Sequence, residues 1–141
     1  MAAGVDFIQT QMIFDMTIFR QFMKKLVDLG VTEKVHILAG VGPLKGSPMA
    51  RFLNEKIPGI VIPEELLQRM DSAVSGISES DKDARRYAWR AEGQKICVEQ
   101  IEELREIEGV SGVHIMAIEW EAAIKPIAER AGLLPRPDLS C

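Results

Sequence analysis

Val35-His-Ile-Leu-Ala-Gly-Val-Gly-Pro43 is an almost unbroken apolar run, and two similar runs lie at Phe7-Ile-Gln-Thr-Gln11 and Val113-His-Ile-Met-Ala-Ile-Glu-Trp120. Strands buried on both faces lose the alternation of apolar and polar residues, and such runs are typical of a parallel sheet covered by helices. Each run is followed by a segment with helical spacing. The sequence therefore predicts three successive βα units of an α/β protein, too few to close a barrel.

Helical periodicity fills the segments between these runs. Helices are expected over about 16–29, 49–56, from Pro63 onward, 79–108 and 121–131. Gly93 lies inside the longest of them and is expected to be either a weak point or a packing contact. Right-handed crossovers would place the three strands side by side and leave open sheet edges.

Composition and charge narrow the function classes. The 141 residues suit one domain, and the net charge of −4 comes from acidic and basic residues interleaved along the chain. Nothing forms the basic stripe that a nucleic acid would need, so no nucleic-acid partner is expected. The apolar runs fall well short of the roughly 20 residues that span a bilayer, and residues 1–6 do not resemble a signal peptide. We expect a cytoplasmic protein without a membrane partner.

The cysteines and histidines offer no obvious reactive site. Cys97 and Cys141 lie far apart in sequence, and we expect reduced thiols, with Cys97 as a small core residue. His36 and His114 are each expected to be second in a strand, near its N-terminal end, as core or supporting residues. No metal site is expected, because neither histidine has a partner at ligand spacing.

Four motifs occur in a specific order, and together they suggest a family. They are Thr10-Gln-Met-Ile-Phe-Asp15, His36-Ile-Leu-Ala-Gly-Val-Gly-Pro-Leu44, Glu99-Gln-Ile-Glu-Glu-Leu104 and Gly112-Val-His-Ile-Met-Ala-Ile-Glu119. With these motifs, and the closing Ala131-Gly-Leu-Leu-Pro-Arg-Pro137, the chain resembles methylenetetrahydrofolate reductase over about residues 4–137.

The resemblance implies an oxidoreductase of one-carbon metabolism and methionine biosynthesis. The family has a (β/α)₈ TIM barrel that carries FAD and passes a hydride to 5,10-methylenetetrahydrofolate, which yields 5-methyltetrahydrofolate. Only the last three βα units match, so the strands would be strands six to eight of an incomplete barrel. Residues 1–134 would form this C-terminal portion, and residues 135–141 a flexible tail.

The resemblance also implies what this sequence lacks. The five preceding units, with most flavin-binding positions and the family's catalytic acid, have no counterpart here. We therefore assign no catalytic residue, leave the cofactor-binding residues unknown, and expect the isolated chain not to catalyse the reaction. Either NAD(P)H or a protein electron donor, such as a ferredoxin-linked partner, would supply the electrons.

The resemblance places four residues at substrate-binding positions of the family: Gln11, Met49, Leu53 and Trp120. Gln11 corresponds to a glutamine in the shared folate and nicotinamide pocket, where an amide can donate and accept at once; the alternative is a satisfied structural amide. Met49 falls where the family often has a polar folate contact, and Leu53 where an apolar residue covers the ligand. Phe52 would take that role if one residue is gapped, and both positions could instead be helix core.

Trp120 departs from the family pattern. Some members place an arginine near folate at this position. A tryptophan could stack on an aromatic part of folate, but it cannot pair with a carboxylate, and Glu119 adds negative charge beside it. Recognition of the folate tail is therefore in question.

Two interpretations from different classes remain. In the first, which we favour, the chain is the C-terminal piece of the reductase, and Met1 directly before a strand-six-like segment suggests a truncation point. In the second, it is a non-catalytic half-barrel that binds or assembles with itself, as a homo-oligomer, or with a partner subunit. Open edges of apolar strands are an aggregation risk in a monomer, so a defined oligomer would favour the second interpretation.

Overall fold

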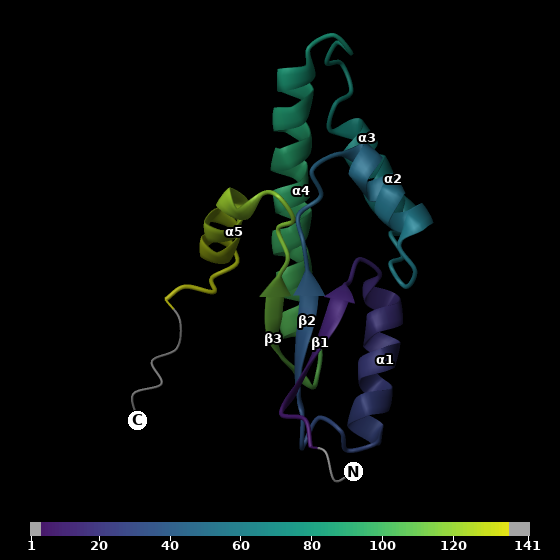
Figure 1. Cartoon of the computed structure of the whole chain (residues 1–141), viewed down its shortest axis with the longest axis vertical. Coiled ribbons are helices and arrows are strands. Elements are labelled where there is room, and N and C mark those ends of the chain that lie inside the picture. The colour runs from purple at the N-terminus through teal and green to yellow at the C-terminus, as the bar shows by residue number, and fades with distance from the viewer. Residues whose placement is uncertain (1–3, 136–141) are drawn as a thin grey trace.

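A parallel three-stranded sheet forms the centre of the molecule. The computed structural model describes residues 4–135. The strands are β1 (Phe7–Met12), β2 (His36–Val41) and β3 (Val110–Ile115), in the order β1-β2-β3. Both neighbouring pairs are parallel, as predicted, and all three arrowheads point the same way in Figure 1. The sheet is open, with β1 and β3 as its edges.

The helices lie close to the predicted ranges. They are α1 (Met16–Asp28), α2 (Ser47–Lys56), α3 (Glu64–Ser72), α4 (Lys82–Arg105), the 3₁₀ turn η1 (Glu121–Ala123) and α5 (Ile124–Arg130). Aspartates fix two of the starts: Asp15 accepts a hydrogen bond from the Ile18 amide at 2.9 Å, and Asp81 accepts one from the Ala84 amide at 3.0 Å. The cap at Asp81 explains why α4 begins later than predicted.

Strand β3 begins three residues earlier than the apolar run predicted. Its ladder with β2 runs from Ile37 opposite Val110 to Val41 opposite Ile115. The chain then leaves the sheet and turns, with Glu119 at a φ of 52°. His114 is therefore the next-to-last residue of β3, and the prediction that it lies near the N-terminal end is wrong. His36, in contrast, is the first residue of β2.

The main core lies between one face of the sheet and the helices. Ile37, Ala39 and Val41 alternate along β2 and point into this core, which is what a half-covered strand requires. Cys97 of α4 is fully buried there, and burial raises the pKa of its thiol to about 12. The expectation that Cys97 is a core residue is confirmed. The other buried members are Phe19, Met23, Val98, Ile101, Leu104, Ile107, Ala123, Ile127 and Ala131.

A second core lies under α2 and α3, which are inserted between β2 and α4. Its buried members are Met12, Phe14, Leu44, Ala50, Leu53, Ile60, Ile62, Leu67, Met70 and Ile96. In Figure 1, α2 and α3 lie beyond the C-terminal ends of the strands, alongside the N-terminal half of α4. The insertion therefore lies at the C-terminal end of the strands, where parallel βα proteins carry their sites.

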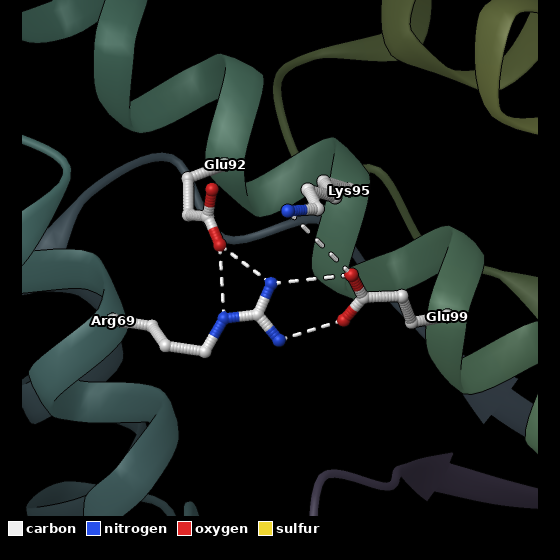
Figure 2. Close-up of polar contacts among 4 residues, drawn as sticks. All are labelled: Arg69, Glu92, Lys95 and Glu99. Carbon is white, nitrogen blue, oxygen red and sulfur yellow. Dashed lines mark hydrogen bonds and ion pairs between the residues drawn. The ribbon is translucent and has the colours of Figure 1, made fainter.

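Two features hold the insertion against α4. Gly93 of α4 faces the backbone of Leu44, and a Cβ at Gly93 would lie 2.8 Å from the Leu44 carbonyl carbon. The residue is thus the packing contact that the sequence offered as one of two alternatives. Arg69 of α3 donates to Glu92 at 2.9 Å and to Glu99 at 2.6 Å, both on α4 (Figure 2). These hydrogen bonds raise the pKa of Arg69, first through Glu99 and then through Glu92.

The opposite face of the sheet has no layer over it within residues 4–135. Residues paired across parallel strands point to the same side, so Gln9, Leu38 and Gly112 share this face. Phe7 and Ile8 on the β1 edge are exposed. An open parallel sheet with helices on one side is consistent with part of a TIM barrel.

Two further expectations concern the rest of the chain. Among the described helices, none combines the length and apolar character needed to cross a membrane. The predicted tail, residues 135–141, falls almost wholly outside the described residues, which end at 135.

Candidate functional site

A β-bulge at the end of β1 sets the orientation of Gln11. Gln9 pairs with Leu38 and Met12 pairs with Gly40, so Thr10 and Gln11 stand opposite Ala39 alone. The Thr10 hydroxyl accepts a hydrogen bond from the Gly40 amide at 2.9 Å. This side-chain oxygen takes the place of a backbone carbonyl as the acceptor for Gly40. Bulges commonly redirect a side chain next to a site.

The side-chain amide of Gln11 is exposed and lies beside Gly59. A Cβ at Gly59 would be 3.7 Å from Nε2 and 3.8 Å from Oε1 of Gln11, and Gly59 has a φ of +85°. Within residues 4–135 the amide has no hydrogen-bond partner. Its donor and acceptor groups are therefore open to a ligand.

A hollow of about 460 Å³ runs from Gln11 along the outer side of β1. Apolar side chains of α1, including Ile18 and Phe22, also line it, as does Val61. Ile18 and Phe22 are large exposed apolar residues. The hollow therefore combines one free amide with an apolar surface at the edge of the sheet.

His114 lies at the same end of the sheet, on the uncovered face. It pairs with Gly40, and its Nδ1 is buried without a partner among the described residues. A Cβ at Gly40 would overlap the Met116 methyl group and the Gln11 backbone. The sequence reasoning missed His114 as a site candidate because it placed β3 three residues too late. The pairing of His114 with Gly40 of β2, beside the bulged end of β1, is what places His114 at the site end of the sheet.

The two predicted positions on α2 differ in exposure. Leu53 is only 6% exposed and belongs to the second core, while Met49 is partly buried against the same core. The Met49 sulfur accepts a hydrogen bond from the Lys45 amide at 3.5 Å. Phe52, the alternative at this position, is 56% exposed. Of the two candidates for covering a ligand, Phe52 has the accessible ring.

Trp120 packs in a different place from the other predicted residues. It is partly buried against the main core, and the guanidinium carbon of Arg90 lies 4.9 Å from the centre of its ring. The neighbouring Glu119 pairs with Lys45 at 3.4 Å. The structure thus places Gln11, α2 and Trp120 at one end of the sheet, but Met49 and Leu53 belong to one cluster and Trp120 to another.

The N-terminus of α2 is not open to the pyrophosphate of FAD. A pyrophosphate commonly binds at an open helix N-terminus. The N-cap of α2 is Gly46, where a Cβ would lie 3.0 Å from the ring of Trp89, and Ser47, the first residue of the helix, is buried. The start of α2 is therefore closed by an aromatic ring, and we derive no chemical step through a flavin from these residues.

Comparison with known proteins identifies the family. Residues 1–132 match the family methylenetetrahydrofolate reductase. The chain is 24% identical over 131 residues to a "Probable methylenetetrahydrofolate reductase (NADPH)" of Caenorhabditis elegans. This match covers 93% of the chain and 18% of that protein. It is 30% identical over 132 residues to "Methylenetetrahydrofolate reductase 1" of Schizosaccharomyces pombe, with 93% and 20% covered. The chain spans about a fifth of the length of these relatives, and it belongs to the methylenetetrahydrofolate reductase family.

Proposed function

We propose that this chain supplies the last three βα units of a flavin-dependent methylenetetrahydrofolate reductase. The observation that carries the proposal is the free amide of Gln11, which the bulge in β1 presents at the site end of a family-matched sheet. In the whole barrel, FAD would supply the hydride chemistry, and NAD(P)H or a protein donor would supply the electrons. The residues of this chain would form one wall of the folate pocket.

Two side chains have definite tasks in this proposal. The Gln11 amide donates to and accepts from the edge of the pterin, or the carboxamide of a nicotinamide, and so fixes the orientation of the ligand. Phe52 covers the ligand ring, since its ring is exposed while Leu53 is committed to the core. This choice favours the alignment with one gapped residue. Met49 and Leu53 then support α2 from below.

The apolar β1 edge supports the assignment to a larger barrel. Ile8, Ile18 and Phe22 are exposed around the hollow beside Gln11. Burying them stabilises an assembly by roughly 25 cal/mol for each Å² removed from water. A preceding βα unit would cover them and would complete the pocket around Gln11. On this proposal, residues 1–134 are the barrel portion and the remaining residues form the tail.

The test compares the chain with the complete barrel, in which five further βα units precede it. We expect the complete barrel to retain FAD through size-exclusion chromatography and to reduce 5,10-methylenetetrahydrofolate. Gln11→Ala should raise the KM for folate about thirtyfold, because two ligand hydrogen bonds of about 1 kcal/mol each are lost. Gln21→Ala is the matched control, since Gln21 is an exposed glutamine on α1, in the helix layer outside the sheet.

The alternative function makes the opposite forecast. The same exposed β1 edge would suit a binding or assembly subunit that pairs with itself or with another chain. Stoichiometric retention of FAD by this chain alone, in an oligomer of defined mass, would contradict the proposal and favour a free-standing subunit. A complete barrel that binds FAD but does not reduce the folate would also contradict it.

A further inference from the structure

Arg90, near the site end of the sheet, has no carboxylate partner, unlike the paired cations around it. Arg86 pairs with Asp83 on the same helix, Arg69 with Glu92 and Glu99, and Lys45 with Glu119. Within residues 4–135, Arg90 forms no ion pair, and its Nε is buried without an acceptor. A buried donor that lacks an acceptor costs free energy that another contact has to offset.

The ring of Trp120 holds the guanidinium of Arg90 in place. The guanidinium carbon is 4.9 Å from the ring centre, which is within the range of a cation–π contact. Such a contact uses the charge of the guanidinium and leaves its N–H groups without acceptors. Because Nε is buried, the two terminal N–H₂ groups are the donors that remain to bind a carboxylate through two parallel hydrogen bonds.

Comparison with Arg85 shows that stacking alone does not account for Arg90. Arg85 lies 5.1 Å from the ring centre of Trp89, a similar arrangement on the same helix. Arg85 also donates to the backbone carbonyl of Ile77 at 3.1 Å. Arg85 is thus both stacked and hydrogen-bonded, whereas Arg90 is only stacked.

The position of Arg90 places it at the site end. The N-terminal half of α4 extends beyond the arrowheads of the strands in Figure 1, and Trp120 follows β3 in the loop at that end. Lys45, in the loop after β2, contacts Glu119 directly beside Trp120. Arg90 and Lys45 therefore contact two adjacent residues, Trp120 and Glu119. The carboxylate that Lys45 pairs with belongs to Glu119, whose side chain is 85% exposed.

We propose that Arg90, held against Trp120, binds a carboxylate of the glutamate tail of the folate substrate. This inference rests on the proposed function, which supplies the ligand. The tail carries two carboxylates, and the site offers the terminal N–H₂ groups of Arg90, while Lys45 pairs with Glu119, the residue before Trp120. Trp120 then has a role at the position where the resemblance implied an arginine: the cation comes from α4, and the loop after β3 supplies the aromatic surface that orients it.

The experiment uses the complete, FAD-loaded barrel and two ligands that differ only in the tail. 5-Methyltetrahydrofolate carries the glutamate, and 5-methyltetrahydropteroate lacks it; each dissociation constant is measured by flavin absorbance. Arg90→Met should raise the dissociation constant of the folate by about tenfold to a hundredfold and leave that of the pteroate unchanged. Arg86→Met is the matched control, because Arg86 lies on the same helix but is paired with Asp83, and it should change neither.

A second variant guards against misfolding. Arg90→Lys keeps the charge but not the planar fork, and it should weaken folate binding partially while pteroate binding stays constant. Equal weakening of both ligands, or of neither, in both Arg90 variants would overturn the inference while leaving the reductase assignment intact. If the unmodified barrel reduces no folate and binds neither ligand, the proposed function fails, and the inference fails with it.

Discussion

Replacing Gly93 by alanine tests how closely α4 approaches the loop that follows β2. In an exposed helix interior, Gly→Ala stabilises by about 1 kcal/mol, because glycine has the higher conformational entropy in the unfolded chain. At Gly93 the added Cβ would lie 2.8 Å from the carbonyl carbon and 3.0 Å from the nitrogen of Leu44. The contacts are with backbone atoms, so no side chain can rotate out of the way.

The expected result is therefore a loss of stability. Overpacking a close contact typically costs about 1–3 kcal/mol, and more where backbone has to move. After the gain in helix propensity, the net loss should be about 2 kcal/mol, which lowers the urea midpoint by about 1 M for a protein of this size. Urea unfolding followed by far-UV circular dichroism measures it.

A reciprocal control separates packing from helix propensity. Ala91 is exposed on the same helix, so Ala91→Gly should lower stability by about 1 kcal/mol through propensity alone. If Gly93→Ala were as stable as the unmodified protein, or more stable, the close approach of α4 to Leu44 would be refuted. The insertion of α2 and α3 would then need another anchor.

Three further predictions follow from burial and charge. Leu53→Ala should lower the free energy of unfolding by about 2–5 kcal/mol, whereas Phe52→Ala should change stability by less than about 0.5 kcal/mol and instead weaken folate binding by the complete barrel; denaturation and ligand titration measure the two effects. Arg69→Met should cost about 1–2 kcal/mol through its pairs with Glu92 and Glu99, and Arg51→Met, which breaks one half-exposed pair, under about 0.5 kcal/mol. Cys97 should resist alkylation at pH 8 in the native protein and react once unfolded, as mass spectrometry of its peptide would show; because its pKa is raised from 9.0 to about 12, its contribution to stability should be lost as the pH rises above 9.

Much of the fold followed from hydrophobic pattern and turn chemistry. The runs at Phe7 and Val35 became β1 and β2, as continuous apolar segments of a parallel sheet predict, although the described residues cover only one face of that sheet. Asp15 and Gly30 bounded α1 as expected, with Gly30 at a φ of +66°. Local signals were sufficient for α1 because it carries its own start and stop residues.

The start of β3 could not be predicted from its own composition. The run from Val113 is more apolar than Val110-Ser111-Gly112, but pairing with β2 outweighs local preference. Ser111 also contributes a cross-strand contact, since the Ile37 amide donates to its hydroxyl at 3.3 Å. The start of a strand depends on partners distant in sequence, and the error in the start of β3 led directly to the error about His114.

The candidate site could be predicted only in part from the sequence, for the same reason. Gln11 could be singled out from the family motif, but its exposed, unpartnered amide results from a bulge that appears only in the ladder. Arg90 gave no signal in the sequence. It stands 30 residues from Trp120 on a helix with many charges, and only the packing of α4 beside the loop after β3 brings the two together.

The two cores imply that the parts of the site differ in how far this chain determines them. Phe52 and Arg90 project from helices that the second core, Gly93 and the Arg69 ion pairs hold in place. Gln11 lies on an edge strand whose outer side faces the apolar hollow. Because whatever packs on the β1 edge would also fix the surroundings of Gln11, we expect completion of the barrel to reorganise the Gln11 pocket far more than the Arg90 site. Amide hydrogen exchange should then slow mainly in β1 and α1 when the preceding units are present, and equal slowing throughout α4 would contradict this argument.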